Sequence, residues 1–159
     1  MIIKKCAIFF SLCALLFLVY YFIEIPASNP FFITIKGATL EVEIADTPYL
    51  RKLGLMGRQA LPQHRGVLFI FPFEAIQTFW MKNTTIPLSL AFIRKDGRIL
   101  QILQMEPDQW DRRLAEYRSN EKVCLALEVN QGWFEKQGIT AGDKIHFSRS
   151  VQGRLQSVE

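Results

Sequence analysis

The sequence has few residues of the types that bind metals or form disulfides. Two of its three cysteines, Cys6 and Cys13, lie in an N-terminal apolar run, which leaves Cys124 alone in the rest of the chain. An intramolecular disulfide is therefore excluded there, and a lone thiol in an apolar stretch is typical of a small core residue. The two histidines, His64 and His146, are far apart and belong to no metal-ligand motif. We therefore expect no metal site.

Motifs for nucleotides and charge clusters for nucleic acids are absent as well. The segment Gly54-Leu-Met-Gly57 is neither a phosphate-binding loop nor a dinucleotide fingerprint. The net charge of +4 comes from lysines and arginines that form no dense cluster, which argues against a nucleic-acid partner. No local signature pairs a nucleophile with a base. We expect no cofactor and no nucleic-acid binding, and no motif here defines a reaction.

An uncharged apolar run begins close to the start of the sequence. Residues 6–23 carry no charge and follow Lys4 and Lys5. As a helix at about 1.5 Å per residue, this run is about 27 Å long, close to the hydrocarbon thickness of a bilayer. We expect residues 1–26 to be a signal anchor, a single-pass transmembrane helix in the inner (cytoplasmic) membrane with the C-terminal domain extracytoplasmic. The alternative is a cleaved signal peptide that leaves a secreted or periplasmic domain.

The rest of the chain predicts a mainly β domain. Period-two or continuous β-type runs, separated by turn residues, occur at residues 40–45, 67–71, 78–83, 88–94, 99–105, 123–129 and 144–147. Short helices are expected after the Thr47-Pro48 cap and within residues 130–138. The apolar face of the first helix would consist of Tyr49, Leu50, Leu53 and Met56. Residues 107–119 predict a helical turn or two, or a long loop.

About seven strands with one or two short helices favour a small closed β-barrel, because closure removes exposed strand edges. The expected boundaries are a signal-anchor segment at residues 1–26, a linker and domain start at 27–37, the barrel at 38–149 and a frayed tail at 150–159. After the anchor, one domain of modest size remains.

The segment at residues 78–90, TFWMKNTTIPLSL, contains the strongest indication of a site. In an extended strand over residues 78–83, Trp80 and Lys82 share one face, while Phe79 and Met81 face the core. An aromatic plate beside a cation suits sugar rings or anionic ligands. The alternative is that Trp80 closes one end of the barrel while Lys82 extends into water.

Four further residues complete the predicted ligand-binding set. Asn83 and Thr84 follow Lys82, either as ligand contacts or as side chains that shape the turn before Pro87. Arg58 follows a glycine that ends the first helix, and it either bonds the last helix carbonyls or reaches the same rim. Glu128 lies in an apolar strand, on a side that we expect to be polar, where it is an ion-pair partner for Arg58 or Lys82, or a general acid.

Several motifs together resemble the prokaryotic family called domain of unknown function 192. The stretches are residues 45–58 (ADTPYLRKLGLMGR), 66–71 (GVLFIF), 79–90 (FWMKNTTIPLSL) and 127–147 (LEVNQGWFEKQGITAGDKIHF). The resemblance implies a small β-rich, barrel-like domain, often behind a signal or anchor segment, and brings no established reaction. Its motif residues correspond to Gly54, Leu55, Met56, Arg58, Trp80, Met81, Lys82, Asn83, Thr84, Pro87, Glu128, Gly142 and Asp143. One departure is Ser89, where the family pattern commonly has an acid, so an activity that depends on that acid would be lost.

Three functions remain open from the sequence. The leading hypothesis is a membrane-anchored extracytoplasmic domain that binds a small polar or anionic ligand, carbohydrates included, through Arg58, Trp80, Lys82, Asn83, Thr84 and Glu128. The second is a hydrolase or transferase that uses Lys82 or Glu128 in acid–base chemistry. The third is a scaffold or assembly protein that presents a large apolar patch rather than a pocket.

Overall fold

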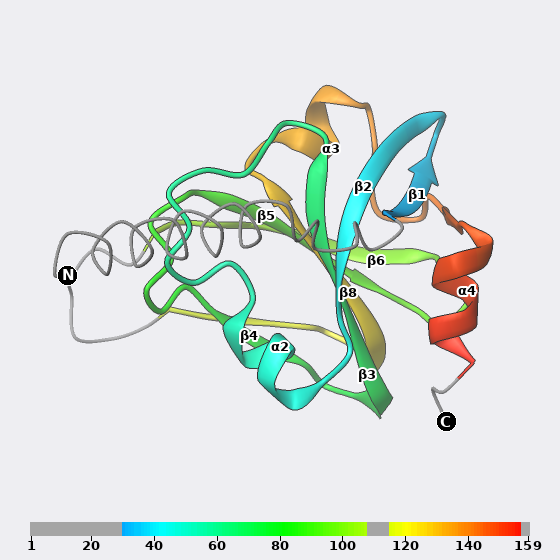
Figure 1. Cartoon of the computed structure of the whole chain (residues 1–159), viewed down its shortest axis with the longest axis horizontal. Helices are drawn as coiled ribbons and strands as arrows, with labels where there is room; N and C mark the ends of the chain where they lie inside the picture. The colour runs from blue at the N-terminus through cyan, green and yellow to red at the C-terminus, as the bar shows by residue number, and fades with distance from the viewer. Residues whose placement is uncertain (1–29, 108–114, 157–159) are drawn as a thin grey trace, which may run out of the picture.

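The computed structural model describes residues 30–107 and 115–156, and the expected anchor at residues 1–26 lies outside this range. A curled sheet dominates the molecule, and short helices lie around it (Figure 1). Its seven strands run in the order β6-β5-β8-β3-β2-β1-β9, and β4 and β7 form a separate pair. Within these residues, no helix combines the length and the apolar character that a membrane span requires.

The elements are short, as turn residues every few positions predict. The large sheet contains β1 (Phe31–Ile35), β2 (Ala38–Ala45), β3 (Arg65–Ala75), β5 (Leu88–Ile93), β6 (Ile99–Met105), β8 (Val123–Asn130) and β9 (Ile145–Phe147). The small pair is β4 (Thr78–Trp80) with β7 (Glu116–Arg118), and the helices are α2 (Pro48–Leu53), α3 (Trp133–Lys136) and α4 (Arg149–Leu155). Neighbouring strands are antiparallel except β2 and β3, which are parallel and therefore need the crossover that contains α2.

The mainly β class is confirmed, but the prediction of a closed barrel was wrong. The edge strands β6 and β9 meet only near one end, through the isolated bridge between Arg98 and Lys144. Strand β9 has three residues, and all three pair with β1. Because β9 is so short, it cannot extend a ladder along β6, and the sheet stays an open half-barrel.

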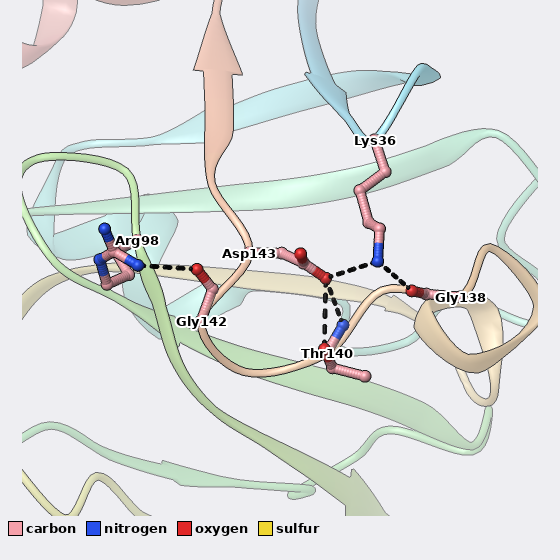
Figure 2. A network of polar contacts seen from close by, with 6 residues as sticks. All are labelled: Lys36, Arg98, Gly138, Thr140, Gly142 and Asp143. Atoms are coloured by element: carbon pink, nitrogen blue, oxygen red, sulfur yellow. Dashed lines mark hydrogen bonds and ion pairs between the residues drawn. The ribbon is translucent and has the colours of Figure 1, made fainter.

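A network of polar contacts holds the sheet edges together near this bridge (Figure 2). The Lys36 Nζ atom, in the turn between β1 and β2, donates to the Gly138 carbonyl at 2.8 Å and lies 3.3 Å from Asp143 Oδ2. The same carboxylate oxygen accepts from the Thr140 backbone amide at 2.8 Å. Arg98 Nη1 donates to the Gly142 carbonyl at 3.0 Å. Gly142 and Asp143, which the family resemblance singles out, therefore have a structural role here.

The central strands β3, β5 and β8 are buried on both faces. Alternate residues of β3 belong to different hydrophobic clusters: Leu68 and Ile70 pack with β1, β2, α3 and α4, whereas Val67 and Phe69 pack with β4, β6 and the loop after α2. Two-sided burial explains why these strands are continuous apolar runs rather than alternating ones. It also means that β8 has no polar-facing side, so the side expected to be polar at Glu128 is part of the second cluster.

Two segments at the borders of the predicted barrel contribute to its core. Strand β1 lies in the range expected to be the linker and the start of the domain, and its Ile33 and Ile35 are buried. Helix α4 lies in the range expected to be a frayed tail, and its Val151 is fully buried. Their weak signals explain the omission, because β1 and α4 are short and each contributes only one or two side chains to the core.

The first helix begins as predicted but does not pack as predicted. Thr47 caps it by accepting a hydrogen bond from the Leu50 amide at 3.2 Å, and Pro48 follows the cap. The helix ends at Gly54 rather than Gly57, and none of its residues is buried. Its apolar side chains Tyr49, Leu50 and Leu53 are exposed, which contradicts the expected core-facing stripe.

Replacing Ser89 by alanine should lower the free energy of unfolding by about 1–3 kcal/mol. Ser89 is fully buried, donates to Gln104 Oε1 at 2.7 Å and accepts from the Gly132 amide at 2.9 Å, so its loss leaves both groups without this partner. Chemical denaturation measures the change. The exposed Ser150→Ala variant is the control, for which we expect a change within about 0.5 kcal/mol. Equal stability of the Ser89→Ala and Ser150→Ala variants would contradict the structural role of the Ser89 hydrogen bonds.

Candidate functional site

A pocket of about 310 Å³ opens between α2, β3 and β4, and we call it the α2 pocket. Its size is within the range of small-molecule sites, which begins at about 300 Å³. Four elements and the loop after α2 supply its walls. The lining residues are Arg51, Lys52, Leu53, Gly54, Leu55, Met56, Phe69, Phe71, Thr78, Phe79, Trp80, Thr84 and Glu128. Four aromatic rings and several aliphatic side chains make the pocket largely apolar.

Glu128 is the one carboxyl group among the described residues that line the α2 pocket. Strand β8 carries it into the second hydrophobic cluster, where the residue is 5% exposed. Its Oε2 atom has no hydrogen-bond partner among the described residues, although buried polar atoms nearly always have one. Burial disfavours the charged form and raises the pKa of Glu128 to about 8. At neutral pH the group is therefore mostly a neutral carboxylic acid, able both to donate and to accept a hydrogen bond.

Gly54 leaves space in front of this carboxyl group. The residue has φ +46°, a conformation that side-chain-bearing residues rarely adopt. A Cβ atom at this position would lie 3.7 Å from Glu128 Oε2 and 3.4 Å from the Phe69 ring. Glycine therefore satisfies the backbone conformation at the end of α2 and also keeps the approach to the acid free of side-chain atoms.

Arg51 fixes the helix over the pocket. Its Nη1 atom donates to the Asp46 carbonyl at 2.6 Å and to the Ile70 carbonyl at 2.9 Å. Its guanidinium carbon lies 5.5 Å from the centre of the Phe71 ring, within the range of a cation–π contact. These contacts attach an otherwise exposed helix to β3, so α2 forms one wall of the pocket although it buries no side chain.

The strand that carries Trp80 is shorter than predicted. It ends at Trp80, and a turn follows, in which the Thr84 amide donates to the Met81 carbonyl at 3.0 Å. Asn83 adopts φ +54°, a conformation that asparagine tolerates better than most residues. Because the chain turns here, Trp80 and Lys82 do not line one site together: Trp80 is 47% exposed and lines the pocket, whereas Lys82 is exposed and outside the lining. Phe79 and Met81 face the core, as predicted.

Three of the six predicted residues line the α2 pocket, namely Trp80, Thr84 and Glu128. Arg58 lies elsewhere and forms a two-pronged pair with Glu43, with both N···O distances at 2.6 Å. This pair raises the pKa of Arg58 and lowers that of Glu43. The expected pairing of Glu128 with Arg58 or Lys82 was therefore wrong. Asn83 serves the turn, and its carbonyl accepts from the Gly57 amide at 2.8 Å.

Most of the aromatic and helical wall lies outside the site predicted from the sequence. Phe69 and Phe71 had been assigned to a uniformly buried strand, and Leu53 to a core-facing stripe. The available signal was Gly54, which belongs to the motif G-L-M-x-R and follows directly after a short helix with basic residues in its last turn. A glycine at such a position indicates a special backbone conformation or close approach of another group. Gly54 has both features, a positive φ angle and the nearby Phe69 and Glu128 side chains.

Residues 31–147 match the model of the DUF192 family, domain of unknown function 192, which is described as “Uncharacterized ACR”. The chain belongs to this family. The resemblance stated from the motifs is thereby confirmed, and the matched range contains every residue that lines the α2 pocket. None of the curated proteins is similar enough in sequence to count as a match.

Two solved structures share the fold. One is a protein from Sinorhizobium meliloti 1021, described as a proposed transcription regulator, with 33% identity, a TM-score of 0.68 and coverage of 75% of this chain and 94% of that chain. The other is a protein of unknown function from Novosphingobium aromaticivorans DSM 12444, with 29% identity, a TM-score of 0.66 and coverage of 76% and 89%. These likenesses support the open, curled sheet as the fold of this DUF192 domain.

Ser89, the departure from the family pattern, lies outside the pocket. Its hydroxyl connects β6 to the amide of Gly132, just before α3. Serine at this position therefore removes no group from the pocket lining.

Wild-type stability should fall as the pH rises from about 5 to 8, and Glu128→Gln should remove this dependence. The carboxyl group titrates near 4.5 when unfolded and near 8 when folded, so the folded state holds the extra proton between these values. The contribution of Glu128 to stability is complete below the unfolded pKa. It is lost as the pH rises through the folded pKa, at up to roughly 1.4 kcal/mol per pH unit. Denaturant unfolding of both proteins across this pH range measures the effect. Parallel plots of unfolding free energy against pH for the wild type and Glu128→Gln would contradict the prediction.

Proposed function

We propose that this DUF192 domain binds a small, uncharged, hydroxyl-bearing ligand with an apolar ring face, of the carbohydrate class, in the α2 pocket. The observation that carries the proposal is the unpartnered Oε2 atom of Glu128 in a largely apolar pocket. A ligand hydroxyl group placed beside this atom would supply the missing hydrogen bond, and a buried polar group gains more from such a bond than an exposed one.

The aromatic wall supports the same ligand class. Trp80 is almost half exposed and lines the pocket, so its indole is available for stacking against one face of a ring. Phe79 lies below it in the core, in edge-to-face contact with Phe69 at 4.9 Å between ring centres. A ligand with one apolar face and one hydroxyl-bearing edge matches a site that has a stacking plate and a single acid.

Anionic ligands fit the pocket less well than the sequence suggested. Arg58 is paired with Glu43, and Lys82 is outside the lining, so two of the expected cations do not reach the site. Arg51 and Lys52 line the pocket, but the Nη1 atom of Arg51 is bonded to two backbone carbonyls, so Lys52 is the lining cation that remains for a ligand. An anion close to Glu128 would also raise the cost of ionising this acid further. We therefore narrow the ligand from polar or anionic to polar and uncharged.

A hydrolase or transferase is the second candidate, and one observation favours it. A buried carboxylic acid with a pKa near 8 resembles the general acids of enzymes, which are tuned to hold a proton at neutral pH. In this function Glu128 would donate its proton to a leaving group, while Lys82 takes no part. Turnover of a chromogenic glycoside that Glu128→Gln abolishes, with binding retained, would favour the enzyme.

We further propose that the domain acts outside the cytoplasm, attached to the inner membrane through residues 6–23, or released after cleavage. The support is the 18-residue uncharged run behind Lys4 and Lys5.

Titration of the full chain in detergent with glucose and N-acetylglucosamine should give saturable binding, measured by calorimetry at pH 7. Trp80→Ala and Glu128→Leu should each weaken binding about tenfold, equivalent to about 1.4 kcal/mol. Glu128→Gln, which mimics the neutral acid, should retain binding, and the matched control Lys82→Ala should leave it unchanged. Inorganic phosphate and citrate serve as anionic comparators. Binding of the anions alone, or equal affinity in all four variants, would overturn the proposal.

A further inference from the structure

Large exposed apolar side chains concentrate on the elements that line the α2 pocket, and two of them, Leu53 and Trp80, belong to the lining itself. Of the six large hydrophobic residues that are exposed within the described ranges, five lie on elements that line the pocket. Tyr49, Leu50 and Leu53 are on α2, Phe73 is near the end of β3, and Trp80 ends β4. We call these five residues the apolar rim. Figure 1 shows α2, β4 and the end of β3 at the same side of the molecule, opposite α3.

The apolar rim is not a by-product of packing. Helix α2 buries none of its residues, and Tyr49 is 72% exposed. Exposed apolar residues that occur singly need no explanation, but several around one opening indicate a surface that contacts another apolar phase. The helix also carries Arg51 and Lys52 in its last turn. Aromatic and leucine side chains next to basic residues are typical of segments that lie in the interface of a membrane.

The start of the domain lies beside this surface. Pro30 and Phe31 line a groove together with Leu50 of the apolar rim and Asp46. The uncharged run at residues 6–23 ends seven residues before Pro30, and seven residues span at most about 25 Å. If the run lies in a bilayer, Pro30 is held within that distance of the membrane, and α2 is next to it.

The charges near α2 permit an approach to anionic headgroups. Three acidic residues border the groove, and each is paired with an arginine: Glu41 with Arg65, Glu43 with Arg58 and Asp46 with Arg154. Because these acids are neutralised, Arg51 and Lys52 set the charge of α2 itself. Basic residues close to a bilayer are attracted to anionic lipids.

We infer that the apolar rim docks on the surface of the bilayer to which the chain is attached, so that the mouth of the α2 pocket faces the lipid headgroups. This inference depends on the expected anchor and not on the ligand proposed for the pocket. A second copy of the chain could cover the same residues, but in an anchored chain the tether keeps the membrane within about 25 Å of Pro30 at any protein concentration. The membrane is therefore the occupant that the position of the chain start favours.

The test uses the full chain reconstituted in vesicles of phosphatidylcholine and phosphatidylglycerol. Cys6 and Cys13 are replaced by alanine, and Cys124 stays because it is fully buried. An environment-sensitive fluorophore is attached at Tyr49→Cys or, as the matched control, at Lys136→Cys on α3 at the opposite side of the molecule (Figure 1). Neither label disturbs the core, because both positions are exposed.

The label at position 49 should shift to the blue, and lipids brominated in the acyl chain should quench it about twofold, since interfacial side chains insert about 5–10 Å into the bilayer. The label at position 136 should show neither effect. Equal, unquenched emission at both positions would show that the rim lies in water and would overturn the inference. A blue shift without quenching by brominated lipid would show that protein covers the rim, and it would also overturn the inference. Sugar titration reports on the pocket separately, so either proposal can fail alone.

Discussion

Coverage of β3, β5 and β8 on both faces is the constraint on which the rest of this structure depends. A sheet with one wet face would place Glu128 in water, where its carboxyl group would ionise at its ordinary pKa. Here the second hydrophobic cluster lies over that face, and the acid is left without a partner for its Oε2 atom. The pocket above it exists because α2 and β4 cover the cluster incompletely. Burial, protonation and the cavity therefore have one structural origin.

The sheet is open because its edge strand β9 is short. Strand β9 is too short to complete a barrel, so a polar network rather than a ladder fastens the edges near Arg98 and Lys144. Two-sided burial compensates for the missing closure, because the central strands are already shielded by helices and by the β4–β7 pair. The DUF192 domain thus stabilises a sheet with free edges without the symmetry of a closed barrel.

Sequence patterns predicted the parts of this fold that depend on local rules. The Thr47-Pro48 cap and the apolar strands were found because caps and hydrophobic runs each have a short-range signature. The burial of Glu128 without an ion-pair partner could not be predicted, because it depends on which face of β8 is covered by elements distant in sequence. The spacing of Trp80 and Lys82 indicated a shared face, but the turn after Trp80 is fixed by long-range contact with Gly57. Three of the six predicted residues therefore line the α2 pocket, and Arg58, Lys82 and Asn83 lie outside its lining.

The absence of a side chain at Gly54 has a consequence for how this pocket can change. A Cβ atom there would be in van der Waals contact with both the Phe69 ring and the Glu128 carboxyl group. A larger residue at this position would adopt a strained backbone conformation and would place side-chain atoms beside the Glu128 carboxyl group. The residue at position 54 thus controls how much space a small molecule has in front of the Glu128 carboxyl group.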